Sequence, residues 1–281
     1  MTVHHPMPPL NFLHGLRYSH DPRLVAFHFK HLRRAFRMVE ALTGASDDAI
    51  RAAYREVATD AAFLEGLAGR YQEVTGRETA GWNYMFLTGS EPRFPFRLVE
   101  AESGGFYFHA FVYYALIRVF KPERAVETGG TPGVSTAFLL KAMERNAQGV
   151  LHTVDLPPDK PLGETDHPGA YHHESMPEGE GSGWLVPAEL KGRHHQHLGD
   201  ARELLPPLLE SLGTMDLFIH DSDHSFQHMA WEFAAAWPYL RPGGLLISDD
   251  IRTNRAFEDF VTEKALTAYR YGGQGAVRKL E

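Results

Sequence analysis

Apolar residues near the start of the chain recur at intervals of three and four, the spacing of a helix that buries one face. This spacing begins after Asp21 and Pro22 and stops at Gly44. It predicts a helix with an aspartate N-cap, a proline in its first turn and a glycine just past its end. The same spacing predicts a second helix from residue 46, with an apolar face formed by Ile50, Tyr54, Val57 and Phe63.

Short apolar runs alternate with helical stretches after residue 123, which is typical of a parallel sheet covered by helices on both faces. Two later runs, on either side of a glycine-rich turn at residues 272–275, predict a closing antiparallel hairpin. The predicted fold class is therefore α/β, with an N-terminal helical extension. Five runs are predicted strands, and each leads into an acidic residue: Glu127, Asp155, Asp200, Asp221 and Asp249.

The composition is that of an ordinary soluble globular protein, with 43% hydrophobic and 23% charged residues among 281. A net charge of −8 without a basic run argues against a nucleic-acid partner. No apolar run is long enough to span a membrane, and the first residues lack the pattern of a signal peptide, so we expect a cytoplasmic protein. The absence of cysteine excludes disulfides, thiolate metal sites and a cysteine nucleophile.

The glycine-rich stretch over residues 124–136 predicts a strand, a tight turn and the start of a helix. Glycine lets the backbone turn sharply and approach a ligand where a Cβ atom would clash. The helix that follows directs free N–H groups toward whatever lies above the turn. A glycine-rich turn without a ligand is the alternative to a nucleotide-type cofactor site. The residues predicted for that site are Glu127, Thr128, Gly129, Gly133 and Ser135.

Acids at the ends of the next two strands extend this candidate site. Glu127 and Asp155 end neighbouring strands, so both lie at the edge where open α/β sheets bind ligands. A carboxylate at that edge can accept hydrogen bonds from the two hydroxyls of a ribose, which is the role predicted for Asp155. A solvated strand-end acid is the alternative. Asp200 is expected at the same edge.

Histidines occur in two groups in this half of the chain. His172 and His173 fall in residues 157–186, a proline- and glycine-rich insertion that we expect to act as a lid or substrate loop. Adjacent histidines rarely chelate one ion, so this pair is expected on the surface. Three more occupy the third strand and its entry, and because side chains alternate between faces we expect them not to converge. These three are His194, His195 and His197.

Three carboxylates are predicted to crowd together where the fourth and fifth strands end. Asp221 follows one buried run, and Asp249 and Asp250 follow the next, so the three lie a few ångströms apart if the strands pair. Unpaired carboxylates at that spacing repel, and a divalent cation such as Mg²⁺ or Mn²⁺ removes the penalty. The alternative is that Asp250 caps the following segment and Asp221 contacts substrate without a metal. A zinc site formed by Asp221, His224 and His228 is a further alternative.

A candidate base lies just beyond the first of these acids. His224 is three residues past Asp221, and an imidazole can take a proton at neutral pH. Asp223 is the second candidate. A histidine that only bonds the backbone is the structural alternative.

Taken together, these residues resemble the class I S-adenosylmethionine-dependent methyltransferases over about residues 105–281. The acid and Gly-x-x-x-Gly turn of the first motif match Glu127, Gly129 and Gly133, and the ribose acid matches Asp155. The segment that lies against the adenine matches Gly199-Asp200-Ala201. The resemblance implies a Rossmann-like, seven-stranded, mostly parallel sheet, with S-adenosylmethionine bound along its carboxyl edge and His220 also near the cofactor. Residues 1–104 would then be an arm and helical extension, serving as a lid or an oligomer contact.

The closer likeness is to metal-dependent O-methyltransferases that act on sugars of macrolide and aminocoumarin antibiotics, and to methyltransferase-like proteins of cephalosporin pathways. Their first acid, their base and their acidic pair match Asp221, then Asp223 or His224, then Asp249 and Asp250. The chain departs from that pattern on both sides of Asp221. His220 and Ser222 stand where an apolar residue and a glycine are usual.

The resemblance implies an enzyme of natural product biosynthesis that methylates a hydroxyl of a small molecule, assisted by Mg²⁺ or Mn²⁺, in a homo-oligomer. A metal-independent methyltransferase acting on nitrogen or carbon is the nearest alternative. A nicotinamide-dependent dehydrogenase would share the glycine turn, but it would prefer Gly-x-Gly-x-x-Gly. A binding module that keeps the cofactor without the chemistry is the non-enzymatic alternative.

Overall fold

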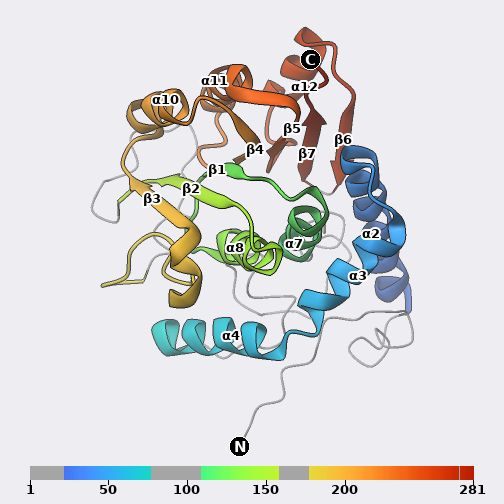
Figure 1. Ribbon diagram of the computed structural model, residues 1–281, viewed down its shortest axis with the longest axis vertical. Helices are drawn as coiled ribbons and strands as arrows, with labels where there is room; N and C mark the ends of the chain where they lie inside the picture. Colours follow the sequence, from blue (N-terminus) through green and yellow to red (C-terminus); the bar gives the residue numbers. More distant parts are fainter. Residues whose placement is uncertain (1–21, 77–108, 158–176, 272) are drawn as a thin grey trace, which may run out of the picture.

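A seven-stranded sheet forms the centre of the computed structural model, with helices on both of its faces (Figure 1). The structure describes residues 22–76, 109–157, 177–271 and 273–281. The strands lie in the order β3-β2-β1-β4-β5-β7-β6; the first five are parallel, and β7 is antiparallel to both β5 and β6. The predicted α/β class with a C-terminal antiparallel hairpin is confirmed. The strands are β1 (Arg124–Thr128), β2 (Val150–Asp155), β3 (His194–Leu198), β4 (Met215–His220), β5 (Leu240–Ser248), β6 (Ala268–Tyr271) and β7 (Gln274–Arg278).

Each face of the sheet packs against its own hydrophobic core. Leu217 and Ile219 of β4 belong to one core, whereas Phe218 between them belongs to the other. Burial on both faces explains why the parallel strands appear in the sequence as continuous apolar runs. Helices α7 (His109–Phe120) and α8 (Val134–Asn146) cover one face. The other is covered by α10 (Ala201–Leu212), α11 (Phe226–Ala236) and α12 (Ala256–Glu263), and short 3-10 turns η2 (Ala188–Arg193) and η3 (Trp237–Tyr239) precede β3 and β5.

The strand order reverses direction between β1 and β4, at the edge formed by their carboxyl ends. From β1 the chain proceeds to β2 on one side, and from β4 it proceeds to β5 on the other, so the connections diverge at this point. Gly129, at φ 81°, makes the close approach here, because a Cβ atom on it would lie 1.9 Å from the carbonyl oxygen of Asp221. The turn after β1 therefore lies directly against the loop after β4.

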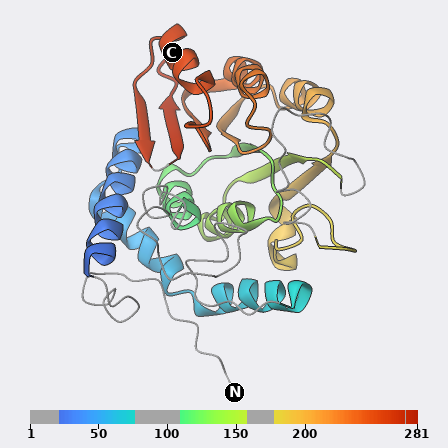
Figure 2. The ribbon, with the colours of Figure 1, turned by 180° about the vertical axis from the view of Figure 1, so that it is seen from behind.

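The described part of the N-terminal extension packs on the sheet domain (Figure 2). It consists of α2 (Pro22–Thr43), α3 (Asp47–Ala58) and α4 (Ala61–Thr75). Leu42, Ile50 and Leu67 from these three helices share one core with Phe138 of α8. The predicted second helix continued to Phe63, but the structure breaks it earlier. The break occurs because the Asp60 carboxylate accepts a hydrogen bond from the Phe63 N–H and so begins a third helix.

Some sequence predictions lie outside the described residues, namely the arm over residues 1–20, most of the loop at 76–104, and His172 and His173. None of the helices in the described part of the chain is both long and apolar enough to cross a membrane.

Candidate active site

Glu127, at the end of β1, is fully buried and directs its carboxylate at the first turn of α8. Its two oxygens accept hydrogen bonds from the hydroxyls of Ser135 and Thr136, each at 2.6 Å. Burial raises the pKa of Glu127 to about 7; the two hydroxyls oppose the rise, and the charge of Asp155 adds to it. Glu127 and Ser135 thus fix the shape of the glycine turn from within.

Asp155, the acid predicted to bind a ribose, lies at the end of β2 and is already surrounded by donors. Its carboxylate accepts hydrogen bonds from the hydroxyls of Thr131 and Ser182 and from the N–H of Leu156. Ser182 belongs to the described end of the insertion, and its neighbour Gly183 lies against Gly133 of the cofactor turn. Two protein hydroxyls therefore donate to this carboxylate, and its role toward a ribose stays a prediction.

The other predicted cofactor residues divide into backbone positions and side chains that turn elsewhere. Asp200 caps α10 by accepting from the Arg202 N–H at 2.9 Å, and Ala201 begins that helix. The side chains of Thr128 and His220 both bond to Glu232 of α11, each at 2.6 Å. The hydroxyl of Thr128 and the Nδ1 of His220 are therefore held by Glu232, whereas His220 Nε2 has no hydrogen-bond partner among the described residues.

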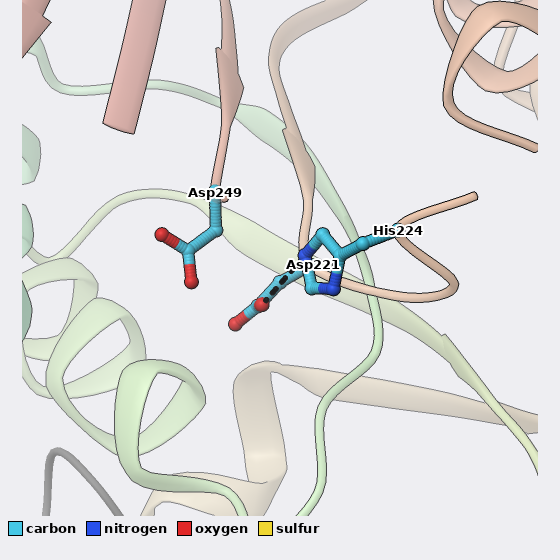
Figure 3. A group of neighbouring side chains, drawn as sticks. All are labelled: Asp221, His224 and Asp249. Carbon is cyan, nitrogen blue, oxygen red and sulfur yellow. Dashed lines mark ion pairs between the residues drawn. The ribbon is translucent and has the colours of Figure 1, made fainter. Parts of the chain in front are cut away.

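Asp221, His224 and Asp249 come together at the carboxyl ends of β4 and β5 (Figure 3). One candidate ligand atom from each side chain lies within 4.8 Å of the others. His224 Nε2 is 3.7 Å from Asp221 Oδ1, and these two side chains are 22% and 29% exposed. Within residues 22–76, 109–157, 177–271 and 273–281, this is the one group of three such side chains that could hold a metal ion.

The charges of this group favour a cation. Burial, followed by the charges of Asp249, Glu127 and Asp250, raises the pKa of Asp221 well above its usual range. Burial and the neighbouring His220 lower the pKa of His224 to about 4, so its imidazole is neutral at pH 7 and can donate a lone pair. Two carboxylate ligands and one imidazole fit a divalent cation that keeps open water positions.

The structure differs from the sequence prediction in the third member of this group. Asp250 lies outside it; this residue adopts φ 48°, and its carbonyl accepts from the N–H and hydroxyl of Thr253. His224 takes the place predicted for Asp250. Asp223, the second candidate base, accepts from the Ser225 N–H at 2.8 Å at the start of α11. His228 bonds to Glu232, so the alternative zinc group that included it is not formed.

The three β3 histidines do not converge, as predicted, but two of them meet a histidine of the neighbouring strand. His195 and His197 are two positions apart and therefore share a face, where both rings stack on His152 of β2, with centroids 4.8 and 5.5 Å apart. His194 points to the other face and bonds to Thr153. The prediction treated the three as one alternating set and did not consider the adjacent strand.

Two residues near the site were missed from the sequence. Tyr113 of α7 is buried, and burial followed by the charges of Asp249, Asp221 and Glu127 raises the pKa of its phenol well above the usual value. Nothing in the apolar sequence around Tyr113 distinguishes it from a core residue. Glu232 did leave a signal, because it is an acid within an otherwise apolar helical stretch, Trp231 to Ala236.

Comparisons with known proteins agree with this architecture. Residues 126–251 match a family model described as a methyltransferase domain. No curated protein sequence matches the chain. Among solved structures, it is similar to the S-adenosylhomocysteine-bound methyltransferase PaMTH1 of Podospora anserina, with 13% identity and a TM-score of 0.46 over 77% of this chain and 88% of that one.

Two other solved structures give similar values. The S-adenosylmethionine complex of the O-methyltransferase TomG of Streptomyces achromogenes has 16% identity and a TM-score of 0.46, over 78% of this chain and 90% of that one. An O-methyltransferase of Bacillus cereus has 15% identity and a TM-score of 0.44, over 76% and 91%. The family match over residues 126–251 includes most of β1 and all of β2 to β5, so this part of the chain is similar to a methyltransferase domain.

Proposed function

We propose that the protein is an O-methyltransferase that moves the methyl group of S-adenosylmethionine to a hydroxyl of a small molecule, such as a natural product or a sugar, with a divalent cation. The observation that carries this proposal is the group formed by Asp221, His224 and Asp249 beside the cofactor turn. Because Gly129 packs on the backbone of Asp221, the turn and the group adjoin.

The β1–β2 side and the β4–β5 side of this sheet edge have different tasks in the proposal. Asp155 and the backbone near Asp200 hold the adenosine, and the turn after Glu127 holds the methionine end of the cofactor. A cation at Asp221 and Asp249 would lower the pKa of a coordinated hydroxyl and fix its oxygen in line with the methyl group. The requirement on the protein is mainly orientation, because the methyl donor is already activated.

The transfer itself forms a C–O bond to the acceptor and breaks the C–S bond of the cofactor, while the acceptor oxygen gives up its proton. His224 can serve this reaction as the nitrogen ligand of the cation or as the acceptor of that proton, with Asp223 as the second acceptor. The variant His224→Gln separates the two roles. Loss of cation affinity marks a ligand, whereas intact cation affinity with lost turnover marks a base.

Calorimetric titration with S-adenosylhomocysteine, run once with Mg²⁺ and once with a chelator, tests the cofactor site. Binding in both conditions supports a methyltransferase whose cation acts on the substrate side. Absence of binding in both, together with binding of NAD, would contradict the proposal. A panel of hydroxylated compounds assayed with and without chelator then tests the role of the cation.

A metal-independent methyltransferase is the second candidate, and one observation favours it. Burial and the neighbouring charge of Asp249 raise the pKa of Asp221, so a proton on this carboxyl can stabilise the pair without an ion. Full turnover in the presence of chelator would support this candidate.

A further inference from the structure

Glu232 of α11 is a fully buried carboxylate that the proposed reaction does not use. One oxygen, Oε2, accepts from the Thr128 hydroxyl and from His220 Nδ1, both at 2.6 Å. The other, Oε1, accepts from the Ser222 hydroxyl at 2.8 Å and from His228 Nε2 at 2.9 Å. Four donors on one buried carboxylate form a satisfied network, and such a network favours a single arrangement.

The donors surround Asp221. His220 precedes it and Ser222 follows it, so the chain is held to the same carboxylate on both sides of this acid. The N–H of Asp221 itself donates to the carbonyl of Thr128 at 2.9 Å, and the side chain of Thr128 also reaches Glu232. The end of β1 and the loop after β4 are therefore tied together through one side chain.

This arrangement explains the two unusual residues that flank Asp221. His220 has no exposed surface, and a buried imidazole is costly unless its polar atoms have partners. Glu232 supplies the partner of Nδ1 at 2.6 Å, whereas Nε2 has no hydrogen-bond partner among the described residues. His220 and Ser222 thus act with Glu232 as one unit.

We propose that Glu232 is a positioning residue that clamps the loop at residues 220–224 onto the end of β1 and so sets the direction of Asp221. The clamp holds the cation group and the cofactor turn in one fixed relation. That catalysis depends on this fixed placement rests on the proposed function. The clamp itself can be tested without a cation or a substrate.

The first test compares Glu232→Gln with Glu210→Gln, the same chemical change at an exposed position of α10. The amide keeps the size of the carboxylate but leaves one acceptor oxygen for four donors. Hydrogen exchange in a peptide covering residues 219–224 should become at least about tenfold faster in Glu232→Gln, with exchange in α8 unchanged. Binding of Mn²⁺ should weaken about 10–100-fold, because changes outside the ligand set that shift a metal ligand have effects of this size. Glu210→Gln should match the wild type in both measurements.

The second test uses smaller changes, which also serve if Glu232→Gln does not fold. Thr128→Val and Ser222→Ala each remove one hydroxyl and leave the carboxylate in place. Each should speed exchange at residues 219–224 by a few fold. If Glu232→Gln folds, adding Ser222→Ala to it should have almost no further effect, because the two groups act as a unit.

The outcomes separate the clamp from the proposed function. If the hydrogen exchange rate at residues 219–224 is unchanged in Glu232→Gln, the clamp proposal is wrong. If Glu232→Gln does not fold, an unchanged rate in both Thr128→Val and Ser222→Ala has the same meaning. Faster exchange confined to this loop supports the clamp, even if the wild type binds no Mn²⁺. In that case the cation role in the proposed function fails and the clamp remains.

Discussion

Carboxylates on the β1–β2 side of the site are surrounded by hydroxyl groups, whereas those on the β4–β5 side face each other. Glu127 accepts from Ser135 and Thr136, and Asp155 accepts from two further hydroxyls. Asp221 instead has Asp249 as a close neighbour, and its pKa is raised by burial and by that neighbouring charge.

This difference in surroundings means that acids at the same sheet edge can favour different ligands. An acid that already binds hydroxyls can exchange them for the hydroxyls of a ligand with little change in charge. Crowded acids need a proton or a cation to offset their repulsion. In the proposed function, the first half would hold the uncharged diol of a ribose and the second half a divalent cation.

The substitution with the largest expected effect is on the β4–β5 side, where Asp221 and Asp249 lie close together. Asp249→Asn removes one charge from the group, so Mn²⁺ affinity should fall more than about 100-fold and turnover should be lost. Binding of S-adenosylhomocysteine should change less than threefold, roughly, because the cofactor turn keeps its contacts. Asp250→Asn is the matched control, since Asp250 lies outside the group, and calorimetry of both variants makes the comparison. If Asp249→Asn and Asp250→Asn bind Mn²⁺ with equal affinity, the assignment of the cation to Asp249 is wrong.

A smaller effect is expected on the hydroxyl-rich side. Asp155→Asn should weaken S-adenosylhomocysteine about 10–100-fold, because hydrogen bonds to a charged acceptor are worth about 1.5–3 kcal/mol. Mn²⁺ binding should remain as in the wild type. Ser182→Ala serves as the control, because it removes one hydroxyl from this carboxylate but keeps its charge. If Ser182→Ala weakens the ligand as much as Asp155→Asn does, the carboxylate is not the ribose acceptor.

Glu127 gives a prediction for stability against pH. Its pKa is about 7 in the folded protein, against 4.5 for an ordinary glutamate, so the folded state binds more protons between these values. The unfolding free energy should therefore fall as pH rises from about 4.5 to 7, by at most about 1.4 kcal/mol per unit from this group. Glu127→Gln should lack that contribution, which urea unfolding at several pH values can measure. The same slope in both proteins would show that another group is responsible.

The parts of this site that follow from chain order could be predicted from the sequence, and those that depend on neighbouring elements could not. Asp155, Asp221 and Asp249 end apolar strands, and parallel strands bring their ends to one edge, so their placement followed directly. Asp250 lies outside the group, and its left-handed backbone at φ 48° could not be predicted from the sequence. The pairing of His152 with His195 and His197 required knowing which strands are adjacent.

The smallest effect is expected where the N-terminal extension meets the hydroxyl-rich side. Arg70 of α4 bonds to Glu180 at 2.7 Å, and Tyr71 packs near Trp184, so this helix holds the segment that brings Ser182 to Asp155 (Figure 2). Arg70→Ala should lower the unfolding free energy by about 0–1 kcal/mol, as expected for an ion pair that is partly exposed, and weaken S-adenosylhomocysteine about threefold.

Arg51→Ala is the matched control for this last change, because Arg51 forms a similarly exposed pair with Asp47 within α3. It should alter stability to a similar extent and leave the affinity for S-adenosylhomocysteine unchanged. A difference in affinity between the two variants would make the extension part of the cofactor site. If the two variants bind S-adenosylhomocysteine with equal affinity, α4 only packs against the sheet domain and does not contribute to cofactor binding.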